Sequence, residues 1–205
     1  MAITIKTFVL GLLSNNTYLG INEKDKTCFL VDPSTSDSNV AEYIESNSLK
    51  LEAILLTHGH FDHIGGVKFF KDRFDCKIYM RAEDVDFIDN PLKIGRKVEK
   101  FTPDVLVEDG EELEICSQKI KVYHTPGHSK GGVCYLLDNL IFCGDTIFRG
   151  SYGRTDFRGG DFSQLQSSVK RILDLDGNYV LLCGHGENTT SEFERIFNPI
   201  FADGN

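Results

Sequence analysis

The feature of this chain that most constrains what it can fold into is the segment THGHFDH at residues 57–63. It places four metal-binding side chains within six residues: His58, His60, Asp62 and His63. The segment follows the short apolar run at residues 51–56, which predicts a buried strand. The cluster therefore lies where a strand ends in a loop, from which side chains can converge on one point. Imidazole and carboxylate ligands together favour a hydrolytic metal site over a structural site made of thiolates.

The composition describes a folded protein and excludes two classes of partner. Of its 205 residues, 40% are hydrophobic and 26% are charged, which is typical of globular proteins. The net charge of −9 argues against general nucleic-acid binding and against anionic membrane surfaces, because both need surplus Lys and Arg. The N-terminal residues lack the pattern of a signal peptide, and no apolar run approaches the roughly 20 residues that span a bilayer. We therefore expect a cytoplasmic protein that acts on a small molecule.

The six cysteines are scattered and form no C-x-x-C pair. In a chain without a secretory signal, their even number is no evidence of disulfides. Free cysteine is among the most buried residue types, so we interpret most of them as small core residues. Cys143 and Cys183 each precede a candidate metal ligand by two residues, and we expect them to be neighbours of the metals rather than ligands.

Strand patterns and helix patterns alternate along the whole chain. The predicted strands cover residues 3–10, 17–21, 27–31, 51–56, 76–80, 105–107, 112–115, 119–124, 133–137, 140–143 and 179–183. The predicted helices cover residues 38–46, 67–74, 82–88 and 162–173, and a last helix runs from 190 or 191 to about 199. This pattern predicts one domain over residues 1–205, with layered α/β architecture and largely antiparallel sheets. Residues 90–104 form either a flap over the site or an ordinary surface loop.

Three further metal candidates stand at the same kind of place as the first cluster. His128, Asp145 and His185 each follow an apolar run and lie next to a glycine. Any one of them alone could be a capping or core residue. As a set, they predict a shared metal site at the ends of several strands. His124 is the one remaining histidine, and we expect it to pack at a strand end or to support a ligand.

Several motifs resemble the metallo-β-lactamase superfamily. The spacing H-x-H-x-D-H is followed by single His, Asp and His residues at strand ends, as in that superfamily. The segments GDTIF at 144–148, GSYGRTD at 150–156 and GGD at 159–161 resemble its glyoxalase II-like branch. The end of the chain, with GHG at 184–186, Thr189, Thr190, Glu194, Asn198 and Pro199, is similar to the short bacterial hydrolases of that branch. The resemblance implies a four-layer αββα sandwich with a binuclear metal site along one sheet edge.

The same resemblance implies a role for each candidate. It implies three ligands for a first metal, three for a second and one bridging carboxylate: His58, His60 and His128; Asp62, His63 and His185; and Asp145. Asp62 and Asp145 are the expected catalytic residues, and Asp62 is expected to orient the nucleophile. The ligand types favour two divalent ions, with zinc expected and iron or manganese also accepted.

Two residues after Asp145 are candidates for substrate binding. Tyr152 and Arg154 lie in the loop that follows it and could meet a substrate carboxylate or amide. An internal ion pair of Arg154 with Asp156 or Asp161 explains that arginine equally well, and the sequence leaves the choice open.

The resemblance has one departure that bears on the substrate. Full-length glyoxalase II enzymes carry a helical region after the last histidine that supplies basic residues for glutathione. Here only residues 186–205 follow His185, so we expect no such glutathione-binding domain.

Four functions therefore remain open. The first is a thioester hydrolase acting on S-lactoylglutathione or a related acylated thiol. The second is a mononuclear-iron persulfide dioxygenase that uses only His58, His128 and Asp145. A phosphodiesterase or nuclease is disfavoured by the acidic charge. A non-catalytic electron-transfer module is disfavoured because di-iron relatives of that kind usually carry Glu at the place of His60.

Overall fold

The computed structural model describes residues 3–90 and 98–201 and contains two six-stranded sheets and a small hairpin. The first sheet has the order β1 (Thr4–Leu10), β2 (Asn15–Asn22), β3 (Thr27–Val31), β4 (Lys50–Leu55), β5 (Lys77–Met80) and β6 (Val105–Leu106). The second has the order β14 (Thr189–Thr190), β13 (Val180–Cys183), β10 (Leu140–Gly144), β9 (Val133–Leu137), β8 (Gln118–His124) and β7 (Glu112–Ile115). The hairpin pairs β11 (Ile147–Phe148) with β12 (Ser151–Tyr152).

The helices lie between these strands in the chain. They are α1 (Ser38–Ser46), α2 (Phe61–Ile64), α3 (Val67–Phe74), α4 (Asp86–Asp89), α5 (Phe162–Leu173) and α6 (Ser191–Phe197), with short 3-10 turns η1 (Ala82–Asp84) and η2 (Pro199–Phe201). In the described parts of the chain, no helix is long and apolar enough to cross a membrane.

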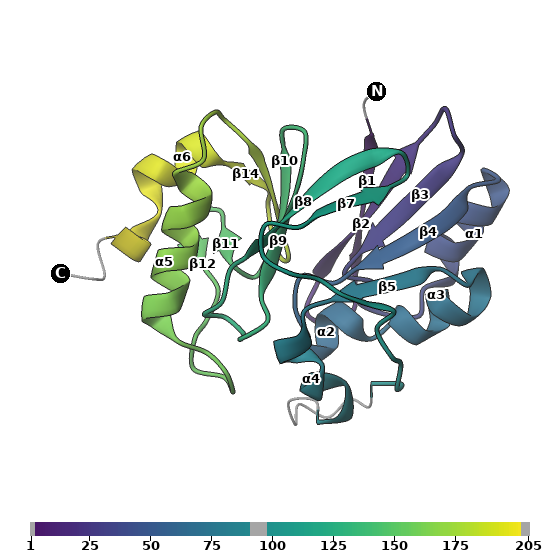
Figure 1. Cartoon of the computed structure of the whole chain (residues 1–205), viewed down its shortest axis with the longest axis horizontal. Coiled ribbons are helices and arrows are strands. Elements are labelled where there is room, and N and C mark those ends of the chain that lie inside the picture. Colours follow the sequence, from purple (N-terminus) through teal and green to yellow (C-terminus); the bar gives the residue numbers. More distant parts are fainter. Residues whose placement is uncertain (1–2, 91–97, 202–205) are drawn as a thin grey trace.

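Three buried clusters separate four layers. The central cluster lies between the two sheets and contains Phe29 of the first sheet and Tyr135 and Phe142 of the second. A second cluster packs α1 and α3 against the outer face of the first sheet. A third packs α5 against the outer face of the second sheet. Figure 1 shows the resulting order, with helices outside both sheets. The predicted αββα sandwich is confirmed.

The predicted antiparallel pairing holds for most of the second sheet and is wrong for three of the five strand pairs of the first. In the first sheet, β3, β4, β5 and β6 are paired in parallel. The reason is connectivity: helix α1 joins β3 to β4, and α2 and α3 join β4 to β5, and such crossovers return the chain in the same direction. In the second sheet only the pair of β10 and β13 is parallel, with α5 between them.

Three of the predicted helices begin directly after a side chain that caps them. The side chains of Asp37, Asp161 and Thr190 accept hydrogen bonds from backbone N–H groups in the first turns of α1, α5 and α6. Such caps satisfy donors that the helix itself leaves unpaired. The helix predicted at residues 82–88 is instead divided between η1 and α4.

Two further segments differ from the prediction. Strand β2 begins at Asn15, two residues before the predicted start at residue 17, and Asn15 and Asn16 are buried. Of the predicted flap or surface loop at residues 90–104, residues 91–97 lie outside the described residues. Val98, just after them, is buried and packs on the cluster beneath α1 and α3.

Candidate metal centre

Four segments carry the predicted ligands, and each follows the carboxyl end of a strand; Asp62 and His63 belong to α2. His58, His60, Asp62 and His63 follow β4, and His128 follows β8. Asp145 follows β10 and His185 follows β13. Strands β3 and β4 run parallel, as do β10 and β13, so these segments gather at one edge of the sandwich.

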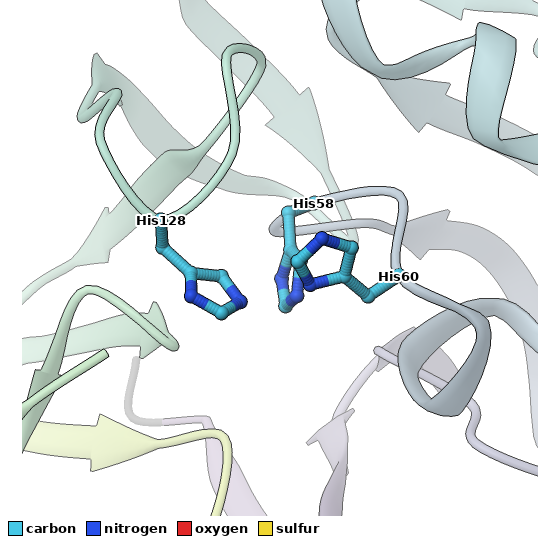
Figure 2. Close-up of side chains that lie close together, drawn as sticks. All are labelled: His58, His60 and His128. Carbon is cyan, nitrogen blue, oxygen red and sulfur yellow. The ribbon is translucent and has the colours of Figure 1, made fainter. Parts of the chain in front are cut away.

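The first group consists of His58, His60 and His128. Their ring centres lie 4.6 to 4.8 Å apart, with the rings edge to face. Figure 2 shows the three rings converging from two loops. All three side chains are buried, and their Nε2 atoms have no hydrogen-bond partner among the described residues. Buried polar atoms are normally satisfied, so three nitrogens that face one point without a hydrogen-bond partner fit a cation site.

The second group consists of Asp62, His63 and His185, which also bring their ligand atoms within 4.8 Å of one another. Asp145 lies between the groups. Its Oδ1 is 3.3 Å from Nε2 of His63, and its Oδ2 is 3.4 Å from Nε2 of His128 and 3.7 Å from Nε2 of His185. The structure thus brings all seven predicted ligands together, with Asp145 where a bridging carboxylate would stand.

Hydrogen bonds at Nδ1 fix which nitrogen of three histidines is free. Nδ1 of His128 donates to the carbonyl of Arg154 at 2.7 Å, and Nδ1 of His185 donates to the carbonyl of Leu13 at 3.0 Å. Nδ1 of His63 lies 2.8 Å from Oδ2 of Asp32. Since a carbonyl can only accept, the proton is on Nδ1 and Nε2 is left as a ligand. Metal-binding histidines are oriented in this way.

Asp32 is a functional residue that the sequence reasoning missed. Its carboxylate accepts hydrogen bonds from the backbone N–H and the hydroxyl of Thr57 as well as from His63. It therefore orients the loop of the first cluster and one ligand of the second group. Asp32 comes directly after the apolar strand β3. Its position after an apolar run, one part of the signal that identified His128, Asp145 and His185, could have identified it, although no glycine lies beside Asp32.

Asp84 was also missed. Its buried carboxylate accepts from the N–H of Gly59 at 2.9 Å, the hydroxyl of Ser129 at 2.6 Å and the N–H of Gly131 at 2.7 Å. Burial raises the pKa of Asp84, and these three hydrogen bonds oppose the rise. The residue joins the loop of His58 and His60 to the loop of His128, and no pattern in the sequence indicates this.

Two imidazoles of the first group, those of His58 and His60, are held in the neutral form. Burial, aided by the nearby His128, lowers the pKa of His60 to about 3. Burial and the adjacent His63 lower the pKa of His58 well below its usual range. Neutral imidazole is the form that binds metals, so these two residues need lose no proton before binding.

The carboxylates of the site are held in the ionised form. Burial opposes the ionisation of Asp145, but its imidazole neighbours, His63 first among them, outweigh that effect and lower the pKa of Asp145. Burial likewise opposes the ionisation of Asp62, and the hydrogen bond with His185 helps to lower the pKa of Asp62. Two anionic carboxylates amid imidazoles make a site for divalent cations.

Glycine is required before His185 because the ligands crowd its backbone. A Cβ on Gly184 would lie 2.3 Å from Oδ1 of Asp145 and 2.8 Å from Cε1 of His63. Any larger residue would displace two ligands. This close approach explains the Gly-His sequence at the end of β13.

The nearby cysteines do not take part. Cys143 and Cys183 are buried, and burial raises the pKa of Cys183 to about 12, so its thiol stays protonated. Thiolate is the ligand form of cysteine. The nitrogen and oxygen donors that remain fit zinc, iron or manganese, and the site is one for divalent metals.

The other predicted residues lie around this centre. Nε2 of His124 donates to the carbonyl of Lys130, so His124 supports the loop of His128 from outside. The guanidinium of Arg154 pairs with both oxygens of Asp156, and Asp161 caps α5 instead. Tyr152 packs against Phe162 of α5. The substrate-binding role of Arg154 and Tyr152 stays a prediction.

The chain is similar to a known protein family and to relatives along most of its length. The family model described as metallo-beta-lactamase superfamily matches residues 10–185. The probable metallo-hydrolase YqgX of Bacillus subtilis is 32% identical, with 93% of each chain covered. The hydroxyacylglutathione hydrolase GloC of Haemophilus influenzae is also 32% identical, with 86% of this chain and 88% of that protein covered.

Solved structures agree in fold along almost the whole chain. The BLEG-1 B3 metallo-beta-lactamase has a TM-score of 0.89 at 34% identity, with 96% of this chain and 98% of that chain covered. TTHA1623 in a di-iron-bound form has a TM-score of 0.84 at 33% identity, with 95% and 98% covered. ETHE1 from Myxococcus xanthus has a TM-score of 0.81 at 25% identity, with 96% and 83% covered.

Proposed function

Because the chain belongs to the metallo-β-lactamase superfamily, we propose that this metal-dependent hydrolase is a thioesterase of the glyoxalase II type. Its substrate would be S-lactoylglutathione or a related acylated thiol. The observation that carries the proposal is the position of Asp145, whose two oxygens face His63 on one side and His128 and His185 on the other. Such a carboxylate suits a two-metal hydrolytic site, and the name of the similar GloC protein supports the reaction class.

Each residue of the centre then has a task. The two groups of ligands would hold two divalent ions, expected to be zinc, which supply a Lewis acid and a hydroxide nucleophile at neutral pH. The ionised Asp62 carboxylate, which lies at the edge of an open hollow, orients the attacking water. Asp145 holds the two groups at a fixed separation.

A thiol leaving group suits this centre. Thiols ionise at a pKa of about 8.5, so a thiolate leaves with little help from a general acid. Among the described residues, the groups that hydrogen-bond to the seven ligands serve to orient them. They are an asparagine amide, a threonine hydroxyl, backbone carbonyls, and the side chains of other histidines and carboxylates. An alkoxide or amine leaving group would need a proton donor in addition.

The test is steady-state hydrolysis of S-D-lactoylglutathione by protein with measured metal content. We expect kcat/KM of about 10⁴ M⁻¹s⁻¹ or more. Asp62→Ala should lower it by about 10²-fold or more, because it removes both a ligand and the group that orients water. Asp72→Ala, which changes an exposed carboxylate on α3, is the matched control. Full activity and full metal content in Asp62→Ala would rule out this mechanism, as they would in His128→Ala.

A second candidate is the mononuclear-iron persulfide dioxygenase, favoured by the similarity to ETHE1 from Myxococcus xanthus. It would need only His58, His128 and Asp145. One iron per chain together with oxygen uptake on a glutathione persulfide would support it over the hydrolase. A chromogenic β-lactam belongs in the same assay, because BLEG-1 is named a metallo-beta-lactamase.

A further inference from the structure

A hollow of about 240 Å³ opens beside the second metal group. Its apolar lining comes from Leu12, Leu13, Phe61 and Val98, and Asp62 lies in its wall. Because Asp62 is one of the seven converging ligands, a group that fills the hollow lies next to the reacting atoms. The hollow is far larger than a lactoyl group needs.

The turn between β1 and β2 forms the outer wall of the hollow and is fixed to the metal centre. The carbonyl of Leu13 accepts the hydrogen bond from Nδ1 of His185. The side chains of Leu12 and Leu13 are nevertheless 77% and 52% exposed. Two exposed leucines at the entrance of a site are stabilised when an apolar group of a ligand covers them.

Charge divides the surroundings of the two metal groups. The described lining of the hollow contains the carboxylates Asp62 and Glu99 and neither Lys nor Arg. Beside His60, by contrast, two aromatic rings each carry a guanidinium, and each guanidinium is also paired with a carboxylate, Arg158 with Asp86 and Arg154 with Asp156. Arg158 lies 4.4 Å from the ring centre of Phe87, and Arg154 lies 3.8 Å from that of Phe157.

Both rings contact His60, with ring centres 4.9 Å (Phe87) and 5.9 Å (Phe157) from its own. The described lining of the hollow thus has carboxylates without cations, whereas the cations on the His60 side balance the carboxylates there. An anionic thiol carrier is therefore better accommodated on the His60 side. An uncharged acyl group is favoured in the hollow, away from the two guanidinium groups. This difference in charge favours one orientation of the thioester, with its thiol carrier on the His60 side and its acyl group in the hollow.

Resting on the thioesterase function, we propose that the hollow is an acyl pocket and that the enzyme prefers uncharged acyl chains longer than lactoyl. Leu12 and Leu13 cover the chain, and Glu99 repels an acyl group that ends in a carboxylate. Arg158, with Arg154, meets the carboxylates of the thiol carrier.

The experiment compares kcat/KM for the butanoyl, hexanoyl and succinyl thioesters of glutathione at measured metal content. Each buried methylene contributes about 0.8 kcal/mol. Because the hollow is open on one side, we expect hexanoyl to exceed butanoyl by about three- to tenfold. Succinyl should fall below butanoyl by about tenfold, and Glu99→Gln should narrow that gap, because like charges in close contact repel.

Leu12→Ser/Leu13→Ser should reduce the hexanoyl-to-butanoyl ratio to about one. It keeps the Leu13 backbone carbonyl, so metal content should not change, and Leu12→Ser alone serves if the double variant folds poorly. Leu106→Ser is the matched control, since Leu106 is a leucine 50% exposed on β6 and outside the hollow; it should keep the wild-type ratio. Calorimetry with S-hexylglutathione and S-methylglutathione gives a readout without turnover, and only wild type and the control should bind the hexyl compound more tightly.

Two results would overturn the acyl pocket. Hydrolysis without preference for chain length, or a preference that survives in the double variant, would remove the pocket and leave the thioesterase function in place. No hydrolysis of any thioester at full metal content would remove both proposals.

Discussion

At the scale of single residues, Asp84 links two of the loops that carry metal ligands. One buried carboxylate receives three hydrogen bonds, from Gly59 in one ligand loop and from Ser129 and Gly131 in another. Neither loop has regular structure of its own at these positions, so the carboxylate helps to set the distance between them, together with the hydrogen bond from the N–H of Val133 to the carbonyl of Thr57. Residues that orient ligands in this way commonly affect metal affinity by about 10- to 100-fold when changed.

Asp84→Asn tests this role with almost no change in volume. The amide replaces one accepting oxygen with a donor that faces N–H or O–H donors, so at least one loop loses its anchor. We expect zinc affinity of the first group to fall by about 10-fold or more, as measured by competition with a chromophoric chelator. Ser129→Ala removes a single donor and should have a smaller effect. Unchanged zinc affinity in Asp84→Asn would show that the loops hold their positions without it.

At the scale of elements, helix α6 holds the hairpin β11–β12 in place. The buried carboxylate of Glu194 on α6 accepts from the N–H of Gly150 in the hairpin turn. It also accepts from the hydroxyl of Thr189 and the side-chain amide of Asn198. The hairpin leads to the loop that carries Arg154, whose carbonyl binds His128. Helix α6, near the end of the described chain, thus supports the position of His128 through the hairpin and the loop of Arg154.

Glu194→Gln measures what this support contributes to stability. The amide turns one acceptor into a donor against three buried donors, and such a mismatch costs about 1–3 kcal/mol. We expect the thermal midpoint to fall by about 2–10 °C, since 1 kcal/mol shifts it by roughly 2–4 °C in a domain of this size. Glu192→Gln changes an exposed carboxylate on the same helix and should leave the midpoint nearly unchanged. An equal shift in both variants would assign the effect to helix charge instead.

The elements also show what sequence patterns could and could not predict. Helices α1, α5 and α6 were predictable because their caps and apolar faces are local in the chain. The parallel pairs of the first sheet were not, because pairing depends on where α1 and α3 pack, which is a property of the whole fold. The hairpin β11–β12 has only two residues in each strand, too few for a period to appear.

The same distinction holds for the site in the whole molecule. His128, Asp145 and His185 were predictable because each stands directly past an apolar strand. Asp84 was not, because its partners are 25, 45 and 47 residues away along the chain and only the folded structure brings them together. Ligands leave a local signal in the sequence, whereas the residues that hold the ligands in position often leave none.

The centre also joins the two halves of the molecule, so its metals should stabilise the whole fold. Four of its ligands follow β4 of the first sheet or belong to α2, and three others follow β8, β10 and β13 of the second sheet. Without cations, the buried Nε2 atoms of the first group and Oδ1 of Asp145 make no hydrogen bond among the described residues. Leaving buried polar groups unsatisfied costs about 1–3 kcal/mol each.

Removal of metal should therefore lower the thermal midpoint of the whole chain by at least about 5 °C. A ligand at 100 times its Kd stabilises the native state by about 2.7 kcal/mol, and 1 kcal/mol corresponds to roughly 2–4 °C here. Calorimetry after chelation, followed by back-titration with zinc, measures the loss and its recovery. Magnesium should restore little, because it prefers oxygen ligands to imidazole. In His60→Ala, part of the zinc-dependent gain should disappear. Equal midpoints with and without zinc would mean that the two sheets are joined by their apolar core alone.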